Sequence, residues 1–194
     1  MARPKSAPPR LAPLEPPYDP EVARTLDRMM PPGAEPLKLF RTVAHNRHLL
    51  DKLRSSGAYL LNFGTLEPRE REIVIHRTCA RCGSEYEWGV HVVAFGRPLG
   101  LSEEQLAATV HGSADDPVWS GREALLVSLV DELHDTATVS DELWAELAAR
   151  WSPEQLVELV VLAGNYHAIA FLTNVFRVEL EEGAARWELE SARS

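Results

Sequence analysis

One short stretch of the sequence holds side chains suited to proton transfer. Glu72, Glu87 and His91 lie within twenty positions of one another, with Ser84 between the first two. A histidine faced by two carboxylates can move protons near neutral pH, because the acids hold it charged or fix its tautomer while burial favours the neutral ring. These residue types therefore indicate general acid–base chemistry centred on His91.

The spacing predicts that three of these side chains share one face of a helix. Gly83 interrupts the preceding helix, and Ser84 with Glu87 three positions later forms the pattern of a capping box, so a new helix is predicted to begin at about Ser84. At about 100° per residue, Ser84, Glu87 and His91 fall within about 60° of one another. The same pattern also fits a plainer alternative, in which Ser84 and Glu87 only cap the helix and His91 is a satisfied core histidine.

Glu72 belongs to the helix before this break, which is predicted to open at Pro68 because proline is favoured in the first turn. Its neighbours at 73–75 are all apolar. A carboxylate in such a run is costly to bury unless it has a partner. We expect His91 to be that partner.

With this pattern the sequence resembles the carboxymuconolactone decarboxylase and alkylhydroperoxidase D-like superfamily, and its decarboxylase-like branch in particular. The pattern is Glu72, eleven residues, Ser84, two residues, Glu87, three residues and His91, set in the words Arg-Glu-Arg-Glu at 69–72 and Gly-Ser-Glu-Tyr-Glu-Trp at 83–88. The resemblance covers about residues 36–183, and its motifs are strongest over 69–101. It implies a single all-α domain, a multi-helix bundle, that assembles as a homo-oligomer with its site near a subunit interface.

The resemblance also implies a reaction. The substrate would be a small organic acid or lactone, and the chemistry a decarboxylation or isomerisation in which a carbanion or enolate is protonated. His91 would be the general acid or base, Glu72 its orienter or a second proton donor, and Glu87 a contact for the substrate or a proton relay. Further candidates around the site are Ser84, Tyr86 and His167.

A thiol peroxidase is the main alternative. In the peroxidase branch of the superfamily, the positions matching Ser84 and Glu87 are the two cysteines of a redox pair. Here the two cysteines of the chain, Cys79 and Cys82, lie upstream as a Cys-x-x-Cys, and Tyr86 stands four positions after the second. A reactive thiol needs a lowered pKa. Nearby cations and a helix N-terminus both lower the pKa of a thiol. Neighbouring arginines supply the positive charge, but the pair precedes the start of the next helix, so only one of these two effects is present.

Two weaker alternatives complete the list of functions. A zinc site built from His76, Cys79 and Cys82 lacks a recognisable second pair of ligands, and His45 with His48 is expected on a solvated or interface surface. No metal and no cofactor are therefore predicted. A non-catalytic binding or assembly protein could also use the scaffold, because a fold does not fix a chemistry.

The composition predicts a soluble, cytoplasmic protein. A chain of 194 residues suits one domain with a substantial core. Its net charge of -9 and sequence pI of about 5.3 argue against nucleic-acid binding, which relies on clustered Lys and Arg. No apolar stretch is expected to approach the roughly 18 residues of a membrane span. The predicted partners are a small-molecule substrate and further copies of the chain, without nucleic acid or membrane.

The pattern of apolar residues is helical throughout, with no alternating runs typical of strands. Residues 1–35 are predicted to form a proline-rich arm with a short helix, 36–183 the helical domain and 184–194 a tail. Residues 1–17 contain six prolines and are expected to form either an extended arm that could lie over a neighbouring subunit or a disordered tail. Helices are predicted at 21–30, from 37 to a stop at 64, from 68, at 84–97, from 103, at 119–133, 141–151 and 153–162, and from 164. The last is apolar on nearly all sides, which predicts burial in the core or between subunits.

Overall fold

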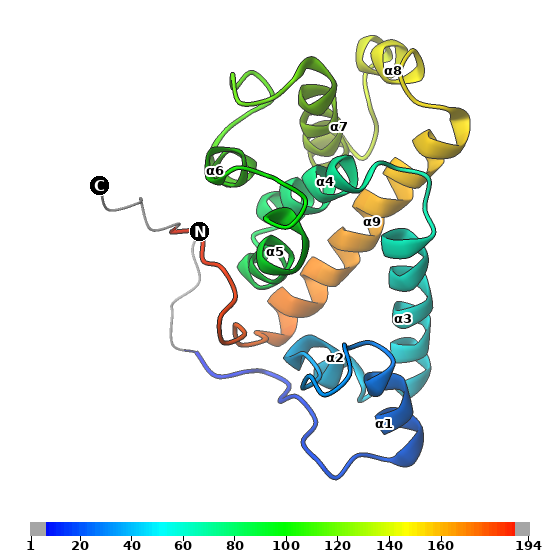
Figure 1. Ribbon diagram of the computed structural model, residues 1–194, viewed down its shortest axis with the longest axis vertical. Helices are drawn as coiled ribbons and strands as arrows, with labels where there is room; N and C mark the ends of the chain where they lie inside the picture. Colours follow the sequence, from blue (N-terminus) through cyan, green and yellow to red (C-terminus); the bar gives the residue numbers. More distant parts are fainter. Residues whose placement is uncertain (1–6, 189–194) are drawn as a thin grey trace. The chain divides into compact units, whose positions relative to one another are not determined.

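The computed structural model describes residues 7–188, and every regular element in that range is helical (Figure 1). The predicted all-α class is therefore confirmed. The elements are α1 (Pro20–Asp27), α2 (Lys38–Val43), α3 (Arg47–Asn62), α4 (Pro68–Arg81), α5 (Glu85–His91), the π-helical turn η1 (Val92–Gly96), α6 (Glu103–His111), α7 (Gly121–Thr136), α8 (Asp141–Ala148) and α9 (Pro153–Phe176). Residues 1–6 of the predicted arm and 189–194 of the predicted tail lie outside the described range.

The described chain divides into two compact units. Residues 7–64 and 172–181 form what we call the N-terminal unit, and residues 65–171 with 182–188 form the site unit. In the N-terminal unit, residues 7–19 contain no helix. Backbone hydrogen bonds from Arg10 N–H to the Phe176 carbonyl (2.9 Å) and from Leu14 N–H to the Arg41 carbonyl (3.1 Å) hold this segment on its own chain. Its placement over a neighbouring subunit stays a prediction.

The helix predicted from residue 37 is interrupted in the structure. The chain leaves α2 after Val43 and begins α3 at Arg47. Asn46 has non-helical torsions there, and its side-chain oxygen accepts a hydrogen bond from Leu49 N–H at 3.1 Å. Asparagine is among the best N-cap residues, so this local bond starts a second helix within an apolar pattern that continues across the break.

Helix α4 is the central element of the site unit. It packs against α5, α6 and α7 (Figure 1), and each residue from 70 to 79 is buried. This burial includes charged side chains as well as apolar ones. A buried charge must be paired or hydrogen-bonded, so the packing of α4 depends on specific polar contacts.

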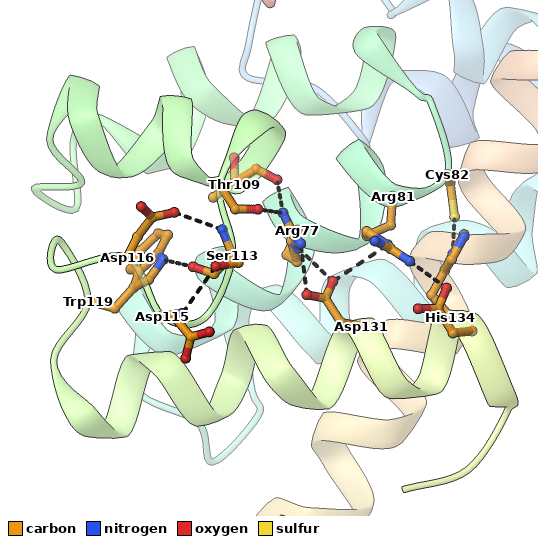
Figure 2. Close-up of polar contacts among 12 residues, drawn as sticks. Arg77, Arg81, Cys82, Thr109, Ser113, Asp115, Asp116, Trp119, Asp131 and His134 are labelled. Atoms are coloured by element: carbon orange, nitrogen blue, oxygen red, sulfur yellow. Dashed lines mark hydrogen bonds and ion pairs between the residues drawn. The ribbon is translucent and has the colours of Figure 1, made fainter. Parts of the chain in front are cut away.

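One set of these contacts is made by Arg77 (Figure 2). Its guanidinium binds both carboxylate oxygens of Asp131 on α7, each at 2.7 Å. The remaining terminal nitrogen donates to the carbonyls of Thr109 and Gly112, both at 3.0 Å. Such bidentate, charge-assisted bonds have a fixed geometry, so Arg77 ties α4 to α7 and to the end of α6.

Helix α9 is continuous, and the predicted break near Gly164 is wrong. A glycine inside a helix costs only about 1 kcal/mol relative to alanine. The helix continues through Gly164 from Pro153 to Phe176. Because the apolar run is not divided, α9 is the one helix of the described residues long and apolar enough to cross a membrane by length and composition. The expectation that no apolar stretch approaches that length is thus also wrong. Half of the window is buried inside the protein, as for a core helix of a soluble bundle, so this is weak evidence for a membrane span.

The predicted burial of α9 on nearly all sides holds for only part of its surface within the chain. Leu159, Leu162 and Ala170 are buried. The other side exposes large apolar side chains, which include Val157 at 66% and Phe171 at 60%. The single chain therefore covers one face of the helix and leaves an apolar face open.

Candidate active site

His91 and Glu72 form a buried pair at the centre of the site unit. His91 is the last residue of α5 and Glu72 lies in the first half of α4. The Nδ1 atom of His91 is 2.9 Å from Oε2 of Glu72, and the exposed fractions of the two residues are only 4% and 0%. The predicted pairing of the two side chains is confirmed. Because an ionised carboxylate only accepts hydrogen bonds, Nδ1 of His91 carries a proton and donates it.

The carboxylate of Glu72 is also held from its other side. Nε of Arg71 donates to Oε1 at 3.1 Å. Burial alone would raise the pKa of Glu72, but the charge and hydrogen bond of His91, with smaller effects of His76 and Arg71, hold the pKa below its usual value. Glu72 is therefore ionised at neutral pH.

A second buried histidine lies beside this pair but is uncharged. Nδ1 of His76 contacts the backbone carbonyl of Glu72 at 2.6 Å. Burial outweighs the attraction of Glu72 and lowers the pKa of His76 to about 4. Its Nδ1 therefore donates to the carbonyl from a neutral ring. Of the two buried imidazoles near Glu72, only His91 can carry charge at neutral pH.

The second ring nitrogen of His91 faces two oxygen atoms. The hydroxyl of Tyr166 on α9 is 3.1 Å from Nε2, and Oε1 of Glu87, one turn earlier on α5, is 3.5 Å away. Burial alone would lower the pKa of His91, but the charge and hydrogen bond of Glu72 and the contact with Glu87 raise it to about 9. His91 is thus an imidazolium at neutral pH, with a proton on Nε2. Burial raises the pKa of Tyr166 well above its usual value, which keeps it a phenol.

The predicted capping box at the start of α5 is only half formed. Ser84 Oγ accepts a hydrogen bond from Glu87 N–H at 3.4 Å, so Ser84 caps the helix as expected. The carboxylate of Glu87 turns toward His91 instead of back to the cap. Its other oxygen, Oε2, is buried without a hydrogen-bond partner. This placement disfavours the plainer alternative for Glu87, because the side chain does not serve the cap.

The π-helical turn η1 covers one face of the His91 ring. Phe95 in this turn lies with its ring centroid 5.0 Å from that of His91, tilted by 36°. On another side the Tyr166 ring meets the imidazole edge-on at 5.1 Å. In the same turn, a Cβ placed on Gly96 would lie 3.0 Å from the His76 ring, so a larger residue there would require this ring to shift by a few tenths of an ångström. Single-turn π-helices occur frequently at functional sites, and this one brings an aromatic ring onto the charged histidine.

Solved structures with a similar arrangement of helices include those of three proteins. No protein-family model matches the chain, and no curated protein matches its sequence. An uncharacterised peroxidase-related protein from Silicibacter sp. TM1040 is similar over 94% of this chain and 99% of its own, with a TM-score of 0.77 and 13% identity. A protein of unknown function from Agrobacterium tumefaciens, described as a candidate antioxidant defence protein AhpD, is similar over 72% and 95%, with a TM-score of 0.66 and 21% identity.

The third is the debrominase Bmp8, which is similar over 89% of this chain and 92% of its own, with a TM-score of 0.71 and 13% identity. A cysteine-to-alanine variant of it was solved in complex with 2,3,4-tribromopyrrole. The chain has the alkylhydroperoxidase D-like fold. At these identities the likeness concerns the fold alone, and the chemistry must be inferred from the side chains.

Within this alkylhydroperoxidase D-like fold, two of the further candidates lie away from the His91 ring. Tyr86 is buried on α5, one position before Glu87, so it projects about 100° away around the helix axis. His167 belongs to a different cluster, because its Nε2 atom is 3.1 Å from Nδ1 of His134 on α7. Tyr166 was not predicted at the site, and nothing in the spacing of α5 residues indicates a partner on α9.

The two cysteines are not joined in a disulfide. Cys79 is fully buried, and burial, with the negative charges of Glu87 and Glu72, raises its pKa well above the usual value. Burial also raises the pKa of Cys82 to about 11, against a smaller opposing effect of Arg81. Since the thiolate is the reactive form, the surroundings of both residues disfavour a redox role at neutral pH.

Proposed function

We propose that this protein is an enzyme in which His91 protonates a carbanion or enolate formed from a small organic acid or lactone. The supporting observation is the position of the buried His91 ring between two carboxylates, with Nδ1 at Glu72 and Nε2 at Glu87; these charges raise the pKa of His91 to about 9. A fixed, charged donor in a water-poor site stabilises negative charge as it develops on a substrate.

In the proposed reaction, the bond between the substrate carbon and its carboxylate breaks, CO₂ leaves, and the electron pair stays on carbon as an enolate. The Nε2–H of His91 then transfers its proton to that carbon, which leaves a neutral imidazole. Glu72 orients the ring through Nδ1 and stabilises the charged form before transfer. With its lowered pKa, Glu72 suits the role of orienter better than that of a second proton donor. Solvent water restores the proton after product release.

Glu87 and Tyr166 suit substrate recognition. The free Oε2 of Glu87 can accept a hydrogen bond from a substrate hydroxyl, and the phenol of Tyr166 can donate one to an oxygen next to the reacting carbon. Phe95 is half-buried over the imidazole, so a substrate that approaches this face of the ring would have to displace its side chain. The complex of the similarly folded debrominase with 2,3,4-tribromopyrrole supports a small cyclic molecule as the ligand class.

A thiol peroxidase is the alternative function. At the level of the fold it is supported as well as the acid–base enzyme is, because two of the similar structures are described as peroxidase-related or AhpD proteins. The buried, protonated thiols of Cys79 and Cys82 give that alternative less support than the His91 cluster gives acid–base catalysis. The apolar side chains exposed on α9, such as Val157 and Phe171, support the predicted homo-oligomer. Cytoplasmic location stays a prediction from the sequence.

The test compares wild type with His91→Gln. A panel of small carboxylated lactones and oxo acids is incubated in deuterated water, and deuterium incorporation and loss of CO₂ are followed by NMR. Removal of a general acid typically costs about 10²–10⁴-fold in rate, so we expect turnover to fall in that range. The control is His111→Gln, which removes an exposed histidine at the end of α6 and should leave turnover unchanged.

Two results would contradict the proposal. The first is unchanged turnover in His91→Gln on a substrate that the wild type converts. The second is rapid, reversible disulfide formation between Cys79 and Cys82 on exposure to peroxide, with peroxide consumption abolished by Cys82→Ser, which would favour the thiol peroxidase. Inactivity toward peroxides and the whole panel would favour a binding or assembly protein.

A further inference from the structure

Three potential metal ligands from three different helices meet away from the His91 cluster. Cys82 follows the last residue of α4, His134 lies in the last turn of α7, and His167 lies in α9. One ligand atom from each falls within 4.8 Å of the other two. Figure 2 shows the Cys82 sulfur and the His134 ring directed at each other beside Arg81. None of these residues takes part in the proposed acid–base chemistry.

The distances within this cluster match those around a tetrahedral metal. Zinc bonds of about 2.3 Å to sulfur and about 2.05 Å to nitrogen place neighbouring sulfur and nitrogen ligands about 3.6 Å apart, and two nitrogens about 3.3 Å apart. Here Sγ of Cys82 is 3.9 Å from Nδ1 of His134, and Nδ1 of His134 is 3.1 Å from Nε2 of His167. These two distances are within a few tenths of an ångström of the values around zinc, and the third, between Sγ of Cys82 and the ring nitrogen of His167, is within 4.8 Å, so this pair would have to approach by up to about 1 Å on coordination.

The tautomer of His167 is fixed by its backbone. Its Nδ1 atom is 3.0 Å from the carbonyl oxygen of Ala163. A carbonyl oxygen only accepts hydrogen bonds, so Nδ1 carries the proton, and in the neutral ring Nε2 offers its lone pair toward His134. Metal-binding histidines are held in the same way, with the second ring nitrogen donating to a backbone carbonyl or a carboxylate.

The charges around the cluster permit a cation. Arg81 is the adjacent positive group, and it pairs with Asp131 (3.5 Å) and with Asp135. Asp131 also binds Arg77, so the two arginines and the two acids balance in charge. Binding of a metal to Cys82 would release the thiol proton and add the negative charge of a thiolate. One sulfur and two imidazole nitrogens suit zinc, whereas calcium and magnesium need oxygen ligands.

We propose that Cys82, His134 and His167 bind a zinc ion, with a fourth coordination position open to water or an incoming ligand. The metal would join the ends of α4 and α7 to α9 within the site unit. This site differs from the set of His76, Cys79 and Cys82 considered from the sequence. His76 donates to the backbone of its own helix beside Glu72, and Cys82 instead faces the two histidines of α7 and α9.

The test measures zinc binding by full-length protein from which any affinity tag has been removed and which has been dialysed against a chelator. Competition with a chromophoric zinc chelator gives the affinity, and elemental analysis gives the stoichiometry. We expect about one zinc per chain in wild type. Loss of an outer hydrogen-bond partner of a metal ligand costs about 10–100-fold in affinity. Cys82→Ser, His134→Gln and His167→Gln each remove a ligand and should weaken binding by at least about 100-fold.

Two matched variants serve as controls. Cys79→Ala removes the other thiol, and His111→Gln removes an exposed histidine of the same unit; both should keep wild-type affinity. Cobalt provides a second measurement, because thiolate coordination gives a charge-transfer band that Cys82→Ser should abolish. Circular dichroism checks that each variant is folded.

Three results would overturn the proposal. They are the absence of stoichiometric zinc in wild type, unchanged affinity in folded Cys82→Ser, and a wild-type cobalt spectrum without the thiolate band. The first and the last of these results are measured on wild type, so the proposal can be refuted even if a variant does not fold. None of these measurements depends on turnover, so the zinc site and the proposed acid–base function can fail separately.

Discussion

Replacing Glu72 with glutamine should change the charge of His91 without changing the shape of the site. Glutamine keeps the size of the side chain and an oxygen that can accept from Nδ1 of His91, which is 2.9 Å from the carboxylate in the wild type. It removes the negative charge, which is the largest effect opposing burial in the titration of His91. Burial then dominates, and the pKa of His91 should fall.

The magnitude follows from the surroundings of the ring. In the wild type the carboxylates raise the pKa of His91 from 6.5 to about 9 despite its burial, which corresponds to about 3 kcal/mol in favour of the charged form at about 1.4 kcal/mol per pKa unit. In Glu72→Gln we expect a pKa of 6.5 or lower. At pH 7.5 the charged fraction of His91 would then drop from roughly 97% to roughly 9% or less.

The assay is an NMR titration of the His91 ring, assigned by its loss in His91→Gln. Glu103→Gln is the control, because it removes an exposed acid that pairs with Arg97 on the surface and should leave the titration of His91 unchanged. If His91 in folded Glu72→Gln still titrated near pH 9, the assignment of its charge to Glu72 would be refuted, and with it the physical basis of the proposed general acid.

Two further outcomes follow from the same contacts. The folded-state pKa of His91 is raised to about 9, so its contribution to stability is fully present below pH 6.5 and is lost as the pH rises through 9. The difference in unfolding free energy between wild type and His91→Gln should therefore shrink by about 3 kcal/mol between pH 6.5 and pH 9. Arg77→Met leaves the carbonyls of Thr109 and Gly112 without their donor and leaves Asp131 only the more distant guanidinium of Arg81, at 3.5 Å. It should destabilise the protein by about 3–5 kcal/mol in urea unfolding, and a loss below about 1 kcal/mol would refute the role given to this contact.

Local helical geometry explains which parts of the site could be predicted. Glu87 and His91 are four residues apart on one helix, so their shared face follows from the helical period alone. Glu72 could be joined to them because a carboxylate in an apolar run needs a partner, and the resemblance narrowed the choice to His91. The cap at Ser84 was equally local. These inferences needed only neighbours in the sequence and one unsatisfied charge.

The parts that could not be predicted depend on helices distant in the sequence. Tyr166 reaches Nε2 of His91 from a helix 75 positions further along the chain, and no spacing rule relates the two. The cluster of Cys82, His134 and His167 has the same origin, since it forms only when three helices pack together. The helix break predicted near Gly164 is wrong for a different reason. A single glycine is only a weak signal for the end of a helix, and α9 continues through it.

Tyr166 and His167 are consecutive residues of α9, and they belong to the two different clusters. One step along a helix is a rise of about 1.5 Å and a turn of about 100°, so the backbone cannot move one side chain without displacing the other. If zinc at His167 alters the affinity of a ligand at His91 by some factor, thermodynamic reciprocity requires that ligand to alter the affinity for zinc by the same factor. Because Tyr166 and His167 are adjacent on α9, the acid–base site would then respond to the zinc concentration around the protein.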